Sequence, residues 1–325
     1  MGVKRKITKN LKADLVLLDE AFAEFIEIKE AQNCAPSTLR NYQQSYDYFK
    51  QFNEWDETAT TDMVEVNQFY HWMHTMRLEG VKATSINHYI RDARVFFYWC
   101  MDADRKYIEP SFKIELMKHQ EEQLKLFMDE DIEALLEKPS RKEDFTTWRT
   151  WAIVNWVLGT GNRSATICEV QIGDINFNKR EIALRFTKNK KIQIIPLSSS
   201  LETVLKEYIR TWRSDAGKED WLFPSISDVK LTTNALRHSF SKYCKDRNVN
   251  QTNIHGLRHN FARGWIKNNG NQFVLQQIMG HQSTEMTRKY VKLFAEDIKE
   301  DFDRFSPLDT IKRNAKRTHK IRANF

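Results

Sequence analysis

Hydrophobic residues in the first third of the chain recur mostly at the spacing of a helix. On a helix drawn through residues 14–30 they fall on one face, at Leu18, Phe22, Phe25 and Ile26. This spacing is typical of an amphipathic helix that packs on a core. The same period recurs in three further stretches, residues 36–52, 61–76 and 84–101. The first third of the chain is therefore predicted to form a domain of about four helices.

The starts of two of these helices carry local signals. Ser37 and Thr38 are candidate caps for the helix of residues 36–52. Asp62 stands three positions before Glu65, a capping-box pattern that predicts a helix beginning there.

The second half adds a short β-rich region to an otherwise helical pattern. Residues 181–186 and 192–195 form two β-rich runs joined by a basic turn. Helical patterns lie on both sides of this region: around residues 151–161, from 200, from 232, from 255 and from 272 to 294. The predicted fold class is mainly α (α+β), in which a helical second domain contains a small antiparallel β-sheet.

Composition divides the chain into segments. The predicted boundaries are a basic tail (1–13), a helical domain (14–110), a polar linker (111–128), a second domain (129–293), and a C-terminal helix with a basic tail (294–325). The last segment repeats Phe294, Ile298, Phe302 and Phe305 among acidic residues, which predicts an aromatic stripe on a helix.

Charge and cysteine content narrow the class of protein. The net charge of +7 comes from 51 basic and 44 acidic residues, and this excess suits an anionic partner. The four cysteines are far apart in the sequence and are expected to be reduced thiols. With no signal peptide and no apolar run of bilayer length in the sequence, a cytoplasmic protein without a membrane partner is expected.

The stretch HGLRH, residues 255–259, has two alternative explanations from local chemistry. His255 and His259 share a helix face, as in the zinc-binding pattern HExxH, but Gly256 replaces the glutamate and Arg258 adds a positive charge. The sequence therefore disfavours a metal there. A helix whose imidazoles are core residues, hydrogen-bonded to the backbone, is the second alternative.

Four separate elements carry basic side chains, arginine, lysine or histidine, and the last of them is followed by a tyrosine. Arg163 follows the turn GTGN, Lys188 lies on the basic turn, and His255 and Arg258 share one helical turn. His281 follows Gly280 and precedes Tyr290 by nine residues. Any one of these is ordinary in isolation, but together and in this order they resemble the tyrosine recombinase, or phage integrase, family.

The resemblance covers nearly the whole chain, since the N-terminal helices with APSTLRNY resemble the family's core-binding domain. It implies a catalytic set of Arg163, Lys188, His255, Arg258, His281 and Tyr290, with Tyr290 as the nucleophile. Lys188 is preferred to Lys190 and Lys191 because it lies eight residues before Pro196, the usual family spacing. One departure is Thr166, where the family commonly has an acidic residue; Glu169 is the candidate substitute.

The resemblance implies a site-specific DNA recombinase that cleaves and rejoins strands through a 3'-phosphotyrosyl intermediate, with no cofactor and no metal. Its expected role is integration or excision of a mobile element, or dimer resolution, without a separate arm-binding domain. Expected partners are double-stranded DNA with inverted-repeat core sites, a homo-tetramer on two duplexes, and accessory directionality proteins.

Candidate DNA-binding residues at helix starts or on polar faces are Thr38, Arg40, Lys82, Thr84, Asn87 and Arg91. The alternatives are a type IB topoisomerase and a non-catalytic DNA-binding accessory protein.

Overall fold

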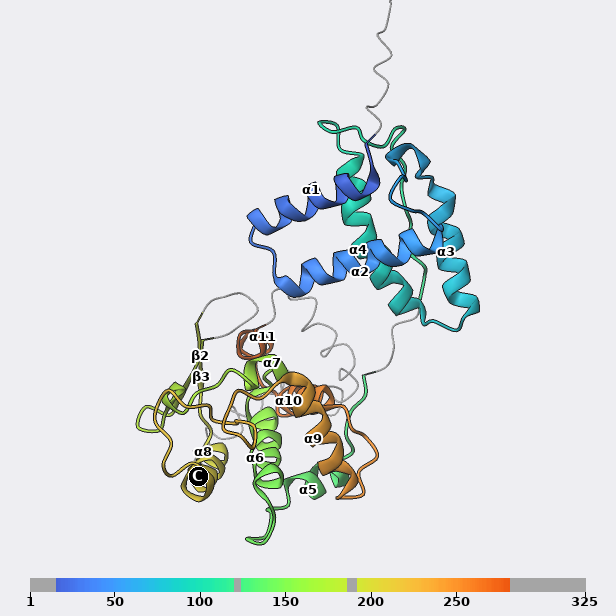
Figure 1. The fold of residues 1–325 in the computed structure, drawn as a ribbon. Helices are drawn as coiled ribbons and strands as arrows, with labels where there is room; N and C mark the ends of the chain where they lie inside the picture. The colour runs from blue at the N-terminus through green and yellow to red at the C-terminus, as the bar shows by residue number, and fades with distance from the viewer. Residues whose placement is uncertain (1–15, 120–123, 186–191, 281–325) are drawn as a thin grey trace, which may run out of the picture. The chain divides into compact units, whose positions relative to one another are not determined.

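The computed structural model describes residues 16–119, 124–185 and 192–280, and the chain divides into two compact units between residues 122 and 123 (Figure 1). Each unit has its own hydrophobic core. In the described part of the chain, every helix is too short or too polar to cross a membrane.

The N-terminal unit contains the four helices that the periodicity predicts. They are α1 (Leu18–Ala31), α2 (Pro36–Phe52), α3 (Val66–Leu78) and α4 (Ala83–Cys100). Their shared core is rich in aromatic side chains: Phe49 stacks on Phe69 at 4.3 Å between ring centroids, and Phe97 meets both rings edge-on. Such contacts add directional preference to the burial of apolar area.

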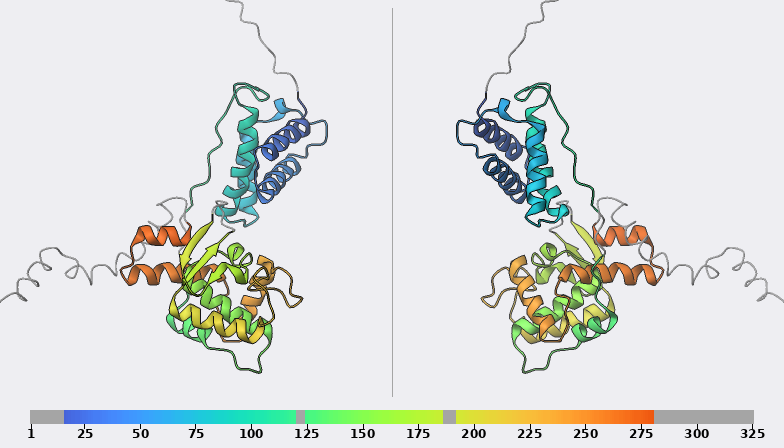
Figure 2. Two further views of the ribbon diagram at one scale, coloured as in Figure 1. Left: turned by 90° about the vertical axis from the view of Figure 1, so that its left-hand side faces the viewer. Right: turned by 90° about the vertical axis from the view of Figure 1, so that its right-hand side faces the viewer.

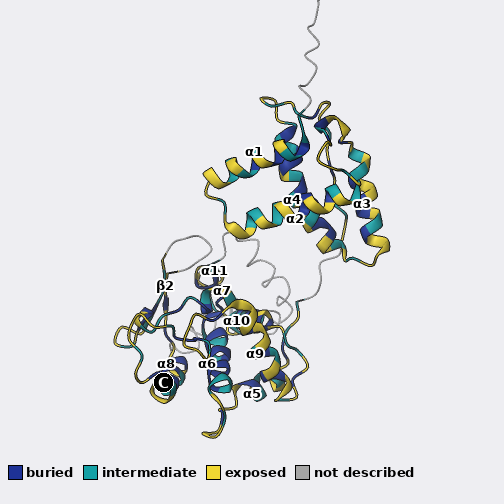
Figure 3. Cartoon of the chain, viewed as in Figure 1, coloured by how far each residue is buried: buried dark blue, intermediate teal, exposed yellow. Residues whose placement is uncertain are grey.

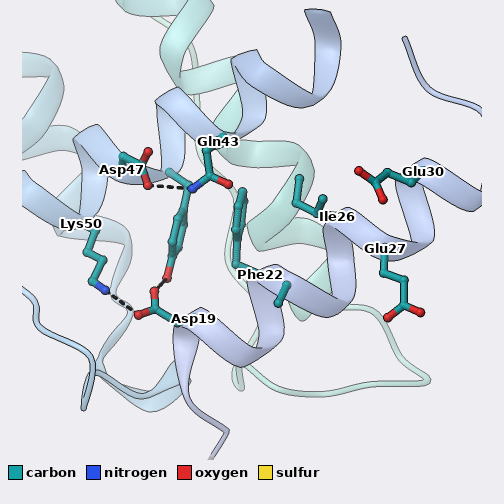
Figure 4. Close-up of a pocket in the computed structure, with 10 residues that line it drawn as sticks. Asp19, Phe22, Ile26, Glu27, Glu30, Gln43, Asp47 and Lys50 are labelled. Atoms are coloured by element: carbon teal, nitrogen blue, oxygen red, sulfur yellow. Dashed lines mark hydrogen bonds and ion pairs between the residues drawn. The ribbon is translucent and has the colours of Figure 1, made fainter. Parts of the chain in front are cut away.

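Two polar contacts fix α1 against α2 beside this core. The carboxylate of Asp19 accepts hydrogen bonds from Tyr46 Oη at 2.7 Å and from Lys50 Nζ at 2.6 Å. Figure 4 shows the contact between Asp19 and Lys50. The ring of Tyr46 also stacks on Phe22 at 4.0 Å. The pair of helices is therefore held by both an ion pair and an aromatic contact.

The third helix begins later than the sequence pattern predicted. Thr61–Met63 forms a short 3₁₀ turn, and α3 begins at Val66 with Glu65 as its N-cap. Asp62 accepts a hydrogen bond from the Thr60 hydroxyl and does not cap a helix, whereas the side chain of Gln68 accepts from the Glu65 amide at 2.8 Å. The capping box of α3 therefore begins at Glu65, three residues after the Asp62 that the sequence pattern indicated.

The segment predicted as a linker, residues 111–128, packs on the N-terminal unit at its first described end and on the second unit at its other described end. On one side Ile114 is buried in the N-terminal core, and Asn87 exchanges two hydrogen bonds with the backbone of Met117, at 2.8 and 2.9 Å. On the other side Phe127 is buried in the second core, and its backbone N–H and C=O both bond to the side chain of Asn260.

The second unit is built around α6 (Phe145–Thr160), in which ten of sixteen residues are buried (Figure 3). Such a helix is surrounded by neighbours, which explains its almost continuous apolar sequence. The remaining helices of the unit are α5 (Asp129–Leu136), α7 (Ser164–Ile167), α8 (Ser199–Trp212), α9 (Thr233–Lys245), α10 (Ile254–Lys267) and α11 (Gln272–Met279).

The sheet of this unit, drawn as yellow-green arrows in Figure 2, is antiparallel, as predicted. Its strand order is β1-β2-β3. The strands are β1 (Ile175–Asn176), β2 (Glu181–Leu184) and β3 (Gln193–Pro196), where β1 is a short strand that the sequence pattern did not reveal. Glu181 pairs with Pro196 and Leu184 with Gln193, so β2 and β3 are in register over four pairs.

The helix expected over residues 272–294 ends much earlier, at Met279. Gly280 adopts the left-handed conformation (φ 61°, ψ 44°), and its N–H bonds back to the carbonyls of Gln276 and Gln277. This geometry is a common way to end a helix and favours glycine. The predicted helix of residues 294–305 lies outside the described residues.

Candidate active site

Arg163 is placed by a tight turn at the end of α6. Gly161 caps that helix in the left-handed conformation, and a Cβ there would lie 2.4 Å from the ring of Phe261. The side chain of Asn162 accepts a hydrogen bond from Trp156 Nε1 at 3.0 Å, which fixes the turn. The chain then enters α7 with Arg163 as its N-cap residue.

Arg258 and the two histidines of HGLRH lie on the first turns of α10. The side chain of Asn253 caps this helix by accepting from the amide of His255 at 3.1 Å. A Cβ at Gly256 would lie 2.8 Å from the Phe127 ring and 2.9 Å from the Lys125 carbonyl oxygen. The glycine is therefore needed where the chain entering the second unit crosses α10.

The two arginines converge on the end of α11. Arg163 Nη1 donates to the carbonyl oxygens of Met279 and Gly280 at 3.3 and 3.4 Å, and Arg258 Nη2 donates to that of Met279 at 3.0 Å. Arg258 Nη1 also donates to the Gly161 carbonyl, and the Arg258 side chain is only 2% exposed. Two guanidiniums thus meet at one carbonyl, where the partial negative charge of a helix C-terminus favours cations.

The two histidines beside Arg258 favour their neutral forms. Their rings meet edge-on with centroids 4.7 Å apart. Burial lowers the pKa of His255, and the charges of Arg258 and Arg163 lower it further. Burial, followed by the effects of His255 and Arg258, lowers the pKa of His259 to about 4. At neutral pH His255 is therefore an uncharged imidazole beside two permanent cations, able to accept a proton.

This arrangement predicts a loss of stability in mild acid. An unfolded histidine titrates near pH 6.5, whereas folded His259 stays neutral down to about pH 4. Above pH 6.5 His259 is neutral in both the folded and the unfolded chain, and its contribution to the free energy of unfolding is fully present. As the pH falls below 6.5, only the unfolded chain binds a proton at this residue, so the free energy of unfolding falls. The free energy of unfolding should fall between pH 7 and pH 5 in both proteins. We expect the fall to be smaller in His259→Gln than in the wild type, by on the order of 1 kcal/mol. Urea unfolding at both pH values measures this difference, and an equal loss in both proteins would show that His259 does not titrate as expected.

The other predicted site residues divide into two groups. Lys188, His281 and Tyr290 lie outside the described residues. Glu169, the proposed partner for Arg163 in place of an acid at Thr166, instead pairs with Lys230.

One candidate DNA-binding residue, Asn87, was chosen because it was expected at a helix start or on a polar face, and this expectation is wrong. Asn87 does not lie on a polar face: it is 1% exposed, and its amide bonds to the backbone of Met117. A buried amide with both groups bonded to the protein has a structural role. The remaining candidates are half-buried Thr38 and exposed Arg40 on α2, and exposed Lys82, Thr84 and Arg91 at or on α4.

Gln193 is a site residue that the sequence did not reveal. Its side-chain amide donates to the carbonyl oxygen of Ile278 at 2.9 Å and also to that of Gln277, next to the carbonyls held by the arginines. The only sequence signal is a single polar residue within the apolar run of β3.

Family models match both units of the chain. The model of the phage integrase family matches residues 125–297, and the model of the phage integrase N-terminal SAM-like domain matches residues 21–104. The first match alone covers more than half of the chain and contains all six predicted catalytic positions.

Individual proteins match at low identity over nearly their full length. The chain is 23% identical to tyrosine recombinase XerD of Staphylococcus haemolyticus over 292 residues, which cover 89% of this chain and 98% of that protein. It is 24% identical to tyrosine recombinase XerD of Chlamydia trachomatis over 300 residues, with coverages of 90% and 96%.

Two solved structures show the same fold. A lambda integrase dimer bound to a COC' core site matches with a TM-score of 0.66 and 16% identity, over 86% of this chain and 78% of that one. The XerH site-specific recombinase bound to a palindromic difH substrate, a post-cleavage complex, also has a TM-score of 0.66, with 18% identity and coverages of 87% and 83%.

Proposed function

The chain belongs to the phage integrase family of tyrosine recombinases, and we propose that it performs site-specific recombination of DNA with Arg163 and Arg258 as the phosphate-binding pair. The observation that carries this proposal is the meeting of both guanidiniums at Met279, two residues before His281. Arg163 and Arg258 are far apart in the sequence, yet both side chains donate to the same carbonyl oxygen. Their convergence suits an anionic group bound beside the end of α11.

The chemistry follows from the charge of the reacting group. A DNA phosphodiester under attack gathers negative charge on its non-bridging oxygens, and guanidinium N–H groups stabilise that charge without changing protonation state. The Tyr290 oxygen bonds to phosphorus, and the bond from phosphorus to the 5' oxygen breaks. The product is a 3'-phosphotyrosyl link, and the phenolic proton passes to neutral His255 or to solvent.

The leaving 5' oxygen must gain a proton, which is a general-acid role typically worth roughly 10²- to 10⁴-fold in rate. We assign this role to Lys188. We assign to His281 the role of hydrogen-bonding the phosphate. The phosphotyrosyl link conserves the energy of the broken bond, so the 5' hydroxyl of a second strand reverses the step without a nucleotide or a metal. Strand exchange is the outcome. The proposed substrate is double-stranded DNA in the cytoplasm, and the proposed role is integration or excision of a mobile element, or dimer resolution.

A nicked duplex that carries the protein's inverted-repeat site tests this proposal directly. The wild-type protein is expected to form a covalent adduct that resists detergent, in the presence or absence of EDTA, and to exchange strands between two such sites. Relaxation of plasmids that lack the site would indicate a topoisomerase, and binding without an adduct would indicate an accessory protein. The matched relatives bear the names of recombinases and support neither alternative.

The proposed assembly is a homo-tetramer on two duplexes that carry inverted-repeat core sites, and accessory proteins set the direction of exchange. The second unit has a groove that suits an aromatic segment from a neighbouring copy. Its lining residues include Ile132, Leu158, Phe261, Gly264 and Trp265, all from α5, α6 and α10. The proposed occupant is the aromatic stripe of residues 294–305.

Truncation separates docking on a neighbour from packing within the same chain. A chain ending at Lys292 is expected to stay folded and to bind a single site, but to lose the four-protomer complex on paired sites and to lose recombination, because the stripe no longer joins neighbouring copies. Light scattering and thermal unfolding measure the two properties. If the truncated chain unfolds at a much lower temperature, and the full chain never forms a four-protomer complex, the segment packs on its own unit.

A further inference from the structure

The last turn of α11 is held by side chains from three other parts of the second unit. We call Gln193, Arg163 and Arg258, together with the carbonyls of residues 277–280, the α11 clasp. The final carbonyls of a helix have no partners within the helix and must be satisfied from outside. Gln193 donates to the carbonyls of Gln277 and Ile278, whereas the arginines donate to those of Met279 and Gly280.

The two sides of the clasp differ in how firmly they are fixed. Gln193 is the first residue of β3, which pairs in register with β2 over four residue pairs. In contrast, α11 has only eight residues, too few to be stable as an isolated helix. Its position therefore depends on buried Leu275, Ile278 and Met279 and on the clasp. The sheet is the support, and α11 is the element that Gln193 holds in place.

Gln193 also limits which carbonyls the arginines can reach. An arginine has several N–H donors in one plane, and the carbonyl of Ile278, one residue earlier in the helix than that of Met279, would compete for them. Because the Gln193 amide occupies the carbonyls of Gln277 and Ile278, the arginines remain at the very end of the helix. A Cβ placed on Gly280 would lie 3.3 Å from Gln193 Oε1 and 3.8 Å from Arg163 Nη1, so the glutamine and Arg163 flank the same peptide.

We propose that Gln193 is a positioning residue for strand cleavage: by binding the carbonyls of Gln277 and Ile278 to β3, it aligns Arg163 and Arg258 with the segment that carries the nucleophile. The proposal rests on the function proposed above. Gln193 does not contact the reacting atoms, and it acts through the arginines and α11 and not through protonation of the leaving group. Its loss should slow the chemical step at saturating DNA and leave affinity for DNA nearly unchanged.

The test compares Gln193→Met with the matched control Gln171→Met. Methionine keeps the length of the side chain and removes both N–H donors. Gln171 also donates from Nε2 to a backbone carbonyl in the same unit, that of Glu219 at 2.8 Å, which is not part of the clasp. We expect Q193M to form the covalent adduct on a nicked duplex roughly tenfold more slowly at saturating DNA, as loss of hydrogen bonds of ordinary strength implies. DNA affinity should stay within about twofold, and Q171M should cleave as the wild type does.

Two further measurements distinguish positioning from general loss of structure. A 5'-thio leaving group needs no proton, so it should restore cleavage by Lys188→Ala but not by Q193M. Amide hydrogens of α11 should exchange faster in Q193M than in Q171M, while those of β2 and β3 keep wild-type rates. Q193E, which keeps the shape of the side chain but also lacks the N–H donors, should show the same slow cleavage if Q193M folds poorly.

Wild-type cleavage rates in both Gln193 variants, or restoration of Q193M by the thio substrate, would overturn the proposal. These results differ from a failure of the proposed function itself, in which the wild-type protein would form no adduct on any substrate.

Discussion

Replacing Tyr290 by phenylalanine is expected to abolish the covalent protein–DNA adduct while DNA affinity stays within a few-fold of wild type. The change removes only the phenolic oxygen, which the proposed mechanism requires as the nucleophile. Binding depends instead on many contacts to phosphates, so it should persist. Denaturing electrophoresis of the reaction on a nicked duplex measures the adduct, and a mobility-shift titration measures the affinity.

Tyr243→Phe is the matched control for this experiment. Tyr243 lies in α9 of the same unit, 3% exposed, and its hydroxyl donates to the carbonyl of Leu135 at 2.9 Å. Burial raises the pKa of this phenol, so it is a poor nucleophile that we expect to be dispensable for the adduct. An adduct that survives in Tyr290→Phe and disappears in Tyr243→Phe would show that the nucleophile was assigned to the wrong tyrosine.

The second large effect is expected at Arg258. Arg258→Lys keeps a positive charge but loses the planar fork that reaches the carbonyls of Gly161 and Met279 together. We expect cleavage at saturating DNA to slow by roughly 10²-fold or more in both Arg258→Lys and Arg258→Ala, as loss of a preorganised donor to a transition state does. Single-turnover kinetics on the nicked duplex give the rate, and thermal unfolding reports whether the variants remain folded.

Arg149→Lys tests whether any buried arginine of this unit would behave the same way. Arg149 is 3% exposed in α6, and its Nη1 donates to the carbonyl of Pro224 at 2.6 Å. We expect this variant to lose stability but to cleave at nearly the wild-type rate when folded. Cleavage by Arg258→Lys within a few-fold of wild type, or an equal loss in Arg149→Lys, would remove Arg258 from the catalytic set.

Local sequence signals predicted the parts of the fold that depend on neighbouring residues. The periodic apolar positions of the N-terminal helices, such as Phe22 and Phe25, are buried as expected, because a helix that packs on one side needs its apolar residues on one face. Arg258 lies on an early turn of α10 as the spacing of HGLRH indicated. For Arg163 the signal was the turn GTGN, in which Gly161 supplies the left-handed conformation that ends α6.

Two helix boundaries were predicted wrongly because local contacts competed with the pattern of apolar and capping residues. The start of α3 was misplaced because Asp62 bonds to Thr60. The end of α11 was misplaced because the apolar pattern continues past Gly280, where the backbone turns away from the helix.

Asn87 and Gln193 show why polar residues are the hardest to interpret from sequence. Each looks like a surface amide, yet Asn87 bonds to Met117 thirty residues away and Gln193 to Ile278 eighty-five residues away. The sequence by itself determined most of the longer helices, the strands β2 and β3 and the family of this protein, because periodicity and motif spacing are local properties. Only the tertiary structure decided which donors meet at the end of α11, because a buried carbonyl accepts whichever side chain the fold brings within hydrogen-bonding distance.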